Sequence, residues 1–241
     1  MADLFEYTLK TPVYFYQCDQ NKRLKLSMLT ALLSETAGLH YTARGMDHDW
    51  LWERDCAFLL SRYSVAIGRM PATDEEISIT TWECDRTNGA AFRRDFEITA
   101  LDGSRIIWAT SDWIPVSPKT RKIIRMKDFS IPRRGLDRYV ELPSCKRLSL
   151  REGQELGVYR TAFSDMDQNG HMFNAWYADV ILDSLPASLR DKRFSGYEIN
   201  YCREAKLGDE LRLFFSQQDN TVLVKGMLEE KDCFVARLTL E

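Results

Sequence analysis

The apolar and polar positions in the first part of the chain predict a strand, a helix and then four strands. Residues 12–18 are aromatic-rich and strand-like, and Asp19-Gln20-Asn21 follows them directly. A helical stripe of apolar residues comes next and ends near Gly45: Leu26, Leu29, Leu32, Leu33 and Ala37. Four strand-like runs complete this part: 58–68, 76–84, 91–100 and 105–116.

The last part of the chain repeats this order. Strand-like residues 157–163 lead into Asp167-Gln168-Asn169, and a second helical stripe is stopped by Pro186. The stripe consists of Trp176, Tyr177, Val180, Ile181 and Leu185. Four strand-like runs follow it: 194–202, 210–217, 221–228 and 234–240. We therefore interpret the chain as an internal repeat.

The spacing of matching positions gives the register of the repeat. The two Asp-Gln-Asn copies are 148 residues apart, whereas the acidic strand starts at Glu76 and Glu210 are 134 apart. The first copy therefore carries 14 more residues between its helix and its next strand. We place this extra material around residues 45–58, which include Trp50 and Trp52.

A helix followed by an antiparallel meander buries its apolar stripe against one sheet face, which is an α+β arrangement. Two such units in one chain predict a pseudo-twofold pair. The expected divisions are a first half at 1–116, a basic linker at 117–155 and a second half at 156–241.

Composition and charge narrow the possible functions. The net charge of −3 argues against nucleic acid as a partner, and no run approaches the roughly 18 apolar residues of a membrane helix. The start of the chain has no leader character, so we expect a cytoplasmic protein. Six scattered cysteines indicate free thiols, and three dispersed histidines give no metal site. We expect no metal and no cofactor.

Residues 119–138 form a basic segment. They contain eight Lys or Arg and two Asp, a balance of +6 in a chain whose total is −3. Such a segment is either a solvated linker or a docking surface for an acidic partner, because opposite potentials steer encounter.

Two sequence motifs resemble those of one known family. The stretch DMDQNGHMFNAWYADVILDSLP, residues 165–186, resembles the Asp-x-Asn-x-His signature of acyl-acyl-carrier-protein (acyl-ACP) thioesterases. YCREAKLGDEL, residues 201–211, resembles the Arg-Glu-Cys segment of the same family at a fitting distance. Segments of the first half, among them LSRYSVAIGRMPATDEEISITTWE and KTRK, are also similar, so the resemblance covers nearly the whole chain.

The resemblance implies a tandem (double) hotdog fold and hydrolysis of the thioester that joins a fatty acyl chain to acyl carrier protein. Its implied catalytic positions are Asp167, Asn169, His171 and Glu204. The chain departs from many relatives at Ala205, where they have Cys, so no thiol nucleophile is expected there. It also lacks the plastid transit peptide of plant members, which favours a bacterial form or a trimmed chain.

The chemistry of these residue types agrees with hydrolysis. His171 or Glu204 can activate the attacking water, and Asp167 and Asn169 can hold the His171 ring in one tautomer. We expect backbone N–H groups near residues 172–174, at the start of the second helix, to bind the developing oxyanion. Asp-x-Asn before a helix is also an ordinary turn or cap.

The first copy of the repeat lacks the reactive side chains. Arg23 takes the position of His171, and Met70 takes the position of Glu204. We interpret the first half as a structural copy whose helix and Trp50/Trp52 insert enclose the acyl chain.

Acyl carrier proteins are acidic, so the basic segment is a candidate docking surface. Its candidate residues are Lys119, Arg121, Lys122, Arg133 and Arg134. The alternatives are an acyl-CoA thioesterase, an enoyl hydratase or dehydratase, and an acyl-thioester-binding protein without turnover. Chain-length preference and the choice between monomer and homodimer stay open.

Overall fold

A continuous β-sheet runs through both halves of the computed structural model, which describes residues 4–88, 90–142 and 145–241. Along its main path the strands follow the order β1-β3-β4-β5-β2-β9-β12-β11-β10-β8. The first half contains β1 (Glu6–Pro12), α1 (Leu26–Ala43), α2 (His48–Glu53), β2 (Ala57–Ile67), β3 (Glu76–Asn88), β4 (Ala91–Ala100) and β5 (Arg105–Ser117). The second half contains β8 (Gln154–Arg160), α3 (Trp176–Ser184), α4 (Ala187–Arg190), β9 (Phe194–Tyr201), β10 (Glu210–Gln218), β11 (Thr221–Leu228) and β12 (Lys231–Leu240).

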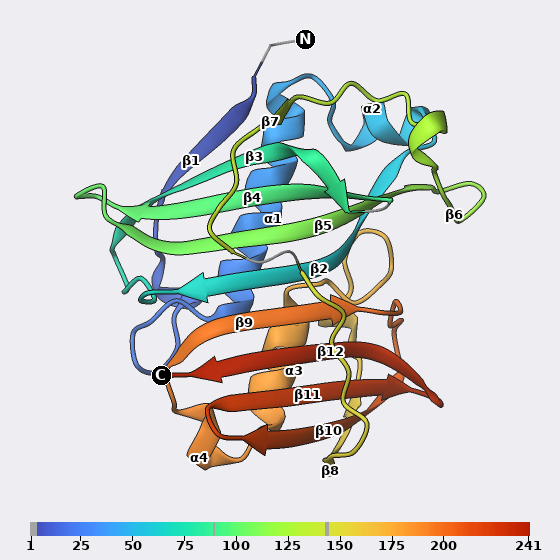
Figure 1. The fold of residues 1–241 in the computed structure, drawn as a ribbon. Helices are drawn as coiled ribbons and strands as arrows, with labels where there is room; N and C mark the ends of the chain where they lie inside the picture. Colours follow the sequence, from blue (N-terminus) through green and yellow to red (C-terminus); the bar gives the residue numbers. More distant parts are fainter. Residues whose placement is uncertain (1–3, 89, 143–144) are drawn as a thin grey trace.

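The two halves meet edge to edge in the middle of this sheet. Strand β2 pairs antiparallel with β9, from Arg62 opposite Asn200 to Ala66 opposite Gly196. Helices α1 and α3 both lie on one face of the sheet, one behind each half (Figure 1). One core of buried residues spans the junction, since it contains Leu29 and Leu33 of α1 together with Ile181 of α3. The predicted α+β fold is confirmed.

Helix α1 is twice as long as α3, with 18 residues against nine. Leu26, Leu29, Leu33 and Ala37 bury one face of α1, as their spacing predicts. In the register of the repeat, α1 corresponds to residues 174–191, which contain α3, the break at Pro186 and α4. The extra residues of the first half therefore lie between the end of α1 and β2 and include the short helix α2, as predicted for residues around 45–58.

The strand predictions are confirmed for the meanders, with β4 and β11 at the predicted bounds. The first strand of each half is displaced. Residues 12–18 were expected to be a strand, but β1 ends at Pro12 and a 3-10 turn covers Phe15–Gln17. Residues 157–163 behave likewise, because β8 ends at Arg160 and a 3-10 turn covers Phe163–Asp165. Exposed aromatic side chains at Phe15 and Phe163 give these turns a strand-like composition.

The repeat extends to individual backbone hydrogen bonds. Asp19 N–H donates to the Arg23 carbonyl at 2.8 Å, and Asp167 N–H donates to the His171 carbonyl at 2.8 Å. The bond from Leu24 to Pro71 likewise has its equivalent in the bond from Met172 to Ala205. Residues 19–23 are hereafter called the twin loop, and residues 167–171 the reactive loop. The two loops thus have the same backbone hydrogen bonds, in the predicted register.

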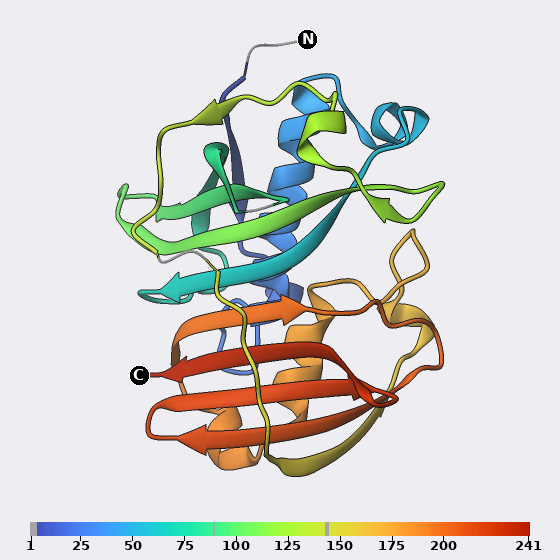
Figure 2. The ribbon, with the colours of Figure 1, turned by 45° about the vertical axis from the view of Figure 1, so that its right-hand side comes forward.

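The segment between the halves crosses the outer face of the sheet, opposite the helices (Figure 2). It includes β6 (Lys122–Ile123), a 3-10 turn at Met126–Asp128 and β7 (Gly135–Leu136). Further along, Leu148 N–H donates to the Asn200 side chain at 2.7 Å, and Leu148 packs with Leu150 and Val235. This segment therefore covers the sheet instead of looping into solvent.

Within the described residues, no helix is long and apolar enough to cross a membrane. The same residues contain no group of three or more His, Cys, Asp or Glu side chains placed to hold a metal ion.

Candidate active site

The fold brings together two of the predicted catalytic side chains. Nε2 of His171 lies 3.1 Å from Oε2 of Glu204, although the residues are far apart in the chain. His171 ends the reactive loop, and Glu204 follows β9 in the segment that leads to β10. Their side chains are 18% and 32% exposed, so the pair is sheltered yet open to water.

The Asp167 carboxylate organises the reactive loop by accepting hydrogen bonds from backbone N–H groups of the loop. Its Oδ1 accepts the N–H of Asn169 at 2.8 Å and the N–H of His171 at 3.3 Å. Gly170 adopts a left-handed φ of 74°, which closes the turn. Asp167 therefore fixes where His171 leaves the loop. These contacts involve the His171 backbone, whereas the ring faces Glu204.

Asn169 lies at the surface of the reactive loop. Its residue is exposed, and its amide nitrogen lies 3.4 Å from Oδ2 of Asp167. The structure does not place it against the His171 ring, but its carboxamide is accessible to a substrate.

The predicted oxyanion site at residues 172–174 is wrong for two of its three N–H groups. Met172 N–H donates to the Ala205 carbonyl at 2.8 Å, and Phe173 N–H donates to the Asp165 carbonyl at 2.8 Å. The reason is that α3 begins only at Trp176, so the preceding residues belong to the loop and its bridge to Ala205. An N–H that is already bonded is not available to a developing oxyanion.

Neither Ala205 nor Cys202 supplies a reactive thiol next to Glu204. Ala205 is fully buried beside Glu204, and partial burial raises the pKa of the Cys202 thiol. A raised pKa reduces the thiolate fraction, which is the reactive form.

A cavity of about 370 Å³, here called the helix cavity, lies beside the reactive loop. Gln168 of that loop lines it, together with residues from α1, α2 and strands β2 to β5. Its apolar wall includes Ala37, Met46, Leu51, Phe58, Phe92 and Trp113. Met46 and Leu51 belong to α2 and its flanking loop, which are extra material of the first half. The additional residues of the first half therefore contribute to this cavity.

Of the residues expected to enclose the acyl chain, few line this cavity. Leu29 and Leu33 are completely buried in the core, so Ala37 is the member of the predicted helical stripe that lines the cavity. Trp52 stacks on His48, and the Trp50 ring lies under Arg54 at 3.8 Å. Met46 and Leu51, on either side of Trp50, line the cavity instead.

One side of the helix cavity is polar. Glu83 accepts a hydrogen bond from the Tyr41 hydroxyl and pairs with Arg94 at 3.5 Å. Burial alone would raise the pKa of Glu83, but Arg94 and the Tyr41 hydroxyl hold it below its usual value. Burial, with Arg94, lowers the pKa of the adjoining His40 to about 4. Sequence patterns had singled out none of these residues.

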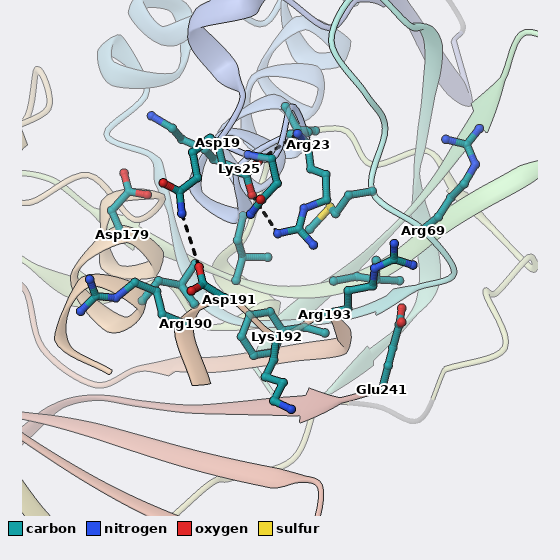
Figure 3. Close-up of a pocket in the computed structure, with 18 of the residues that line it drawn as sticks. Asp19, Arg23, Lys25, Arg69, Asp179, Arg190, Asp191, Lys192, Arg193 and Glu241 are labelled. Carbon is teal, nitrogen blue, oxygen red and sulfur yellow. Dashed lines mark hydrogen bonds and ion pairs between the residues drawn. The ribbon is translucent and has the colours of Figure 1, made fainter. Parts of the chain in front are cut away.

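The twin loop lines a second, larger hollow of about 740 Å³, here called the twin groove (Figure 3). Arg23 and Met70 line it, at the positions of His171 and Glu204. Arg23 turns back onto Asp19, with Nη2 3.2 Å from Oδ2. Charged side chains of both signs surround the groove, from the twin loop and from the segment around Asp191 (Figure 3). Neither His171 nor Glu204 lines the twin groove, and the helix cavity reaches the reactive loop only through Gln168.

The basic segment reaches the pair directly. Nη2 of Arg121 lies 2.6 Å from Oε2 of Glu204. Lys119 and Lys122 are exposed nearby in sequence, whereas Arg133 is half-buried, donates to the Cys84 carbonyl at 2.7 Å and lies over the Phe92 ring. Arg133 is therefore occupied within the chain. Sequence reasoning proposed Arg121 only as a docking charge and missed its contact with Glu204.

The chain is similar to proteins of one known family. The chain matches the acyl-ACP thioesterase N-terminal domain over residues 5–131 and the acyl-ACP thioesterase C-terminal domain over residues 149–232. An oleoyl-acyl carrier protein thioesterase of Arabidopsis thaliana is 24% identical over 93% of this chain and 67% of its own length. An acyl-[acyl-carrier-protein] hydrolase of Cuphea viscosissima is 24% identical over 78% of this chain. The chain covers only 50% of the length of that Cuphea relative.

Solved structures extend the match to the complete fold. An acyl-ACP thioesterase from Bacteroides thetaiotaomicron superposes with a TM-score of 0.90 at 26% identity and covers 100% of both chains. A 12:0-ACP thioesterase from Umbellularia californica shares the fold, with a TM-score of 0.81 at 16% identity over 98% of this chain and 97% of its own. The chain belongs to the acyl-ACP thioesterase family and has its double hotdog fold.

Proposed function

We propose that this protein hydrolyses the thioester of fatty acyl-ACP and releases a free fatty acid. The observation that carries the proposal is the 3.1 Å contact between His171 and Glu204, at a position that the first half fills with Arg23 and Met70. Family membership supports thioester hydrolysis, because the matching relatives are named as acyl-ACP hydrolases or thioesterases.

In this proposal His171 is the general base and Glu204 sets its tautomer. A carboxylate facing Nε2 favours the ring form with its proton on that nitrogen, which leaves Nδ1 free to accept a proton from water. The water oxygen then bonds to the thioester carbonyl carbon, and the C–S bond breaks in the second step. The sulfur receives the proton from His171, so the products are a carboxylic acid and a thiol. Asn169 is the side chain we assign to the carbonyl oxygen.

The helix cavity is the proposed site of the acyl chain. Its lining includes Gln168, which lies between Asp167 and Asn169, so a thioester at the His–Glu pair lies next to it. An apolar wall suits an alkyl chain, and a few polar groups at one side limit how far it extends. The division of labour follows: residues 1–116 hold the chain, and residues 156–241 carry out the chemistry.

The thiol group of the substrate is proposed to belong to acyl carrier protein. Lys119 and Lys122 are exposed beside Arg121, on the segment that reaches the His–Glu pair. An acidic carrier docked there delivers its thioester to Glu204 and His171. The alternative, an acyl-CoA thioesterase, shares the chemistry and differs only in this contact.

The test is an acyl-ACP panel of different chain lengths, with thiol release and free fatty acid measured together. We expect both products in equal amounts, and faster release from acyl-ACP than from the same acyl group on CoA. Hydration of an enoyl thioester without thiol release would identify a hydratase. Tight binding with no release would identify a binding protein.

The docking contact has its own charge-reversal test. Lys119→Glu combined with Lys122→Glu should slow acyl-ACP turnover several-fold, with a smaller effect on acyl-CoA. The matched control is Lys10→Glu with Lys231→Glu, because both lysines are exposed and lie on other parts of the sheet. Equal effects of the two double variants would remove the docking surface from the proposal.

A further inference from the structure

Arg121 contacts the same carboxylate oxygen that faces His171. Its Nη2 lies 2.6 Å from Oε2 of Glu204, and that oxygen lies 3.1 Å from Nε2 of His171. Arg121 precedes Glu204 by 83 residues and comes from the turn between β5 and β6. The contact therefore joins the strands of the first half to the reactive pair of the second half.

The turn that carries Arg121 is held by several hydrogen bonds. Arg121 N–H donates to the Ser117 carbonyl at 2.8 Å, and the Ser117 hydroxyl donates to Asp55 at 2.7 Å. Lys119 N–H donates to the other Asp55 oxygen at 3.1 Å. The Ser117 hydroxyl, followed by the Lys119 N–H, lowers the pKa of Asp55, so this anchor stays ionised. Asp55 follows α2, so the extra material of the first half fixes the turn.

We propose that Arg121 is a positioning residue of the active site, which holds the Glu204 carboxylate against the His171 ring. The inference rests on the proposed function of the His–Glu pair. Glu204 follows the end of β9 and its side chain is 32% exposed, so its carboxylate needs a fixed partner to keep one orientation. A planar guanidinium donates to a carboxylate in a defined geometry and carries its charge at every working pH.

The contact between Arg121 and Glu204 is not explained by a contribution to the stability of the fold. The Arg121 side chain is 65% exposed, and ion pairs this exposed contribute little to folding. Removal of Arg121 should therefore leave the fold intact, which makes its effect on turnover interpretable.

The first experiment compares Arg121→Ala with Arg69→Ala. Arg69 is a matched control, since it pairs with Glu75 at 2.6 Å and is 49% exposed, beside the twin position Met70. The substrates are acyl-ACP and a short acyl N-acetylcysteamine thioester, which carries no protein and no phosphate. We expect Arg121→Ala to lower kcat about 10- to 100-fold on both substrates, because small displacements of catalytic groups have effects of this size. Arg69→Ala should stay within twofold. A loss confined to acyl-ACP, mainly in KM, would make Arg121 a docking charge and overturn the proposal.

A double-mutant cycle with Glu204→Gln tests whether Arg121 acts through Glu204. In the Glu204→Gln background, Arg121→Ala should cost less than twofold further, because the group it positions is already lost. If the activity losses of Arg121→Ala and Glu204→Gln multiply in full in the double variant, the proposal is contradicted. Arg121→Lys should recover part of the activity, and added ethylguanidinium should partly rescue Arg121→Ala.

An NMR measurement keeps this inference separate from the proposed function. The ring ¹⁵N signals of His171 should shift in Arg121→Ala and stay unchanged in Arg69→Ala. If the wild-type protein releases no thiol, the proposed function fails, and the NMR comparison still decides whether Arg121 holds the pair. Unchanged His171 signals in Arg121→Ala, with thiol release intact, would refute the positioning role alone.

Discussion

The twin loop and the reactive loop share their backbone and differ in their side chains. In each, an Asp carboxylate accepts the backbone N–H groups two and four residues further along, Asp19 in the first half and Asp167 in the second. The repeated phrase is therefore a turn that both halves need in order to fold. The proposed chemistry depends on two side chains outside those bonds, His171 and Glu204. A shared turn is consequently no evidence of a shared activity. The larger volume of the twin groove is no evidence of activity in the first half either.

The first half nevertheless contributes to the second half's site in two ways. Its longer helix α1 and short helix α2 line the helix cavity, and its β5–β6 turn delivers Arg121 to Glu204. The pseudo-twofold pair is thus asymmetric: the His–Glu pair lies in the second half, whereas the first half supplies the helix cavity and Arg121.

The largest difference between the loops should come from the reactive pair. We expect His171→Ala to lower hydrolysis by about 10² to 10⁴-fold, the usual contribution of a positioned general base. Glu204→Ala should cause a loss of the same order, because the His171 ring then lacks the carboxylate that sets its tautomer. The paired controls are Arg23→Ala and Met70→Ala, which should stay within twofold. Thermal unfolding of all four variants checks the fold. A comparable loss in the first-half variants would contradict the assignment of chemistry to one loop.

The sequence was sufficient to predict the repeat and its register, because the evidence for them is local. The Asp-Gln-Asn turns, the acidic strand starts and the alternation of the meanders each specify a short segment. Pairing His171 with Glu204 needed the family resemblance, since residues 33 apart come together only through the fold.

Features that depend on packing between distant segments could not be predicted. The contact of Arg121 with Glu204 spans 83 residues, and no periodicity encodes it. The 14-residue offset gave the amount and the place of the extra chain, but not that part of it forms α2 and lines the helix cavity. The availability of the Met172 and Phe173 N–H groups depended on where α3 begins, which the apolar stripe did not define.

The second test compares the two aspartates of the loops. Asp19→Ala and Asp167→Ala each remove the acceptor of two backbone N–H groups, so each should lower the free energy of unfolding by about 0.5–2 kcal/mol, as for a lost cap. Asp167→Ala should also lower turnover up to about 100-fold, because His171 is displaced. Urea unfolding and steady-state kinetics give both values. Equal activity losses in the two variants would show that the twin loop is also functional.

The third test uses acid, because the first half contains the buried histidine His40. Burial lowers the pKa of His40 to about 4 in the folded protein from its usual 6.5, so between these values the unfolded chain binds a proton that the folded chain does not. Stability should therefore fall as pH drops from about 6.5 to about 4, by about 2–3 kcal/mol from this residue. Urea unfolding at pH 7 and pH 4.5 measures the loss.

His40→Gln removes the titrating ring and keeps a donor for the Leu4 carbonyl, which His40 contacts at 3.2 Å. Its stability should change less with pH than that of the wild type. His48→Gln, at an exposed histidine, is the matched control and should follow the wild type. If all three proteins lose the same stability on acidification, His40 is not the acid-sensitive group.

The smallest effect is expected where the two halves differ in helix length. Gly38 lies in the extended part of α1, lines the helix cavity and has open space where a Cβ would be. Gly38→Leu should raise the free energy of unfolding by about 0.5–1 kcal/mol, because Gly is a poor helix former. It should also reduce turnover of the longest accepted acyl chains about tenfold relative to short ones, since lost room for a few methylenes has effects of this order. Gly38→Ala is the control, with the same gain in stability and a smaller change in preference. Competing pairs of acyl-ACP substrates measure the ratio directly. An unchanged ratio in Gly38→Leu would place the acyl chain elsewhere and would leave the extra turns of α1 without a role in substrate selection.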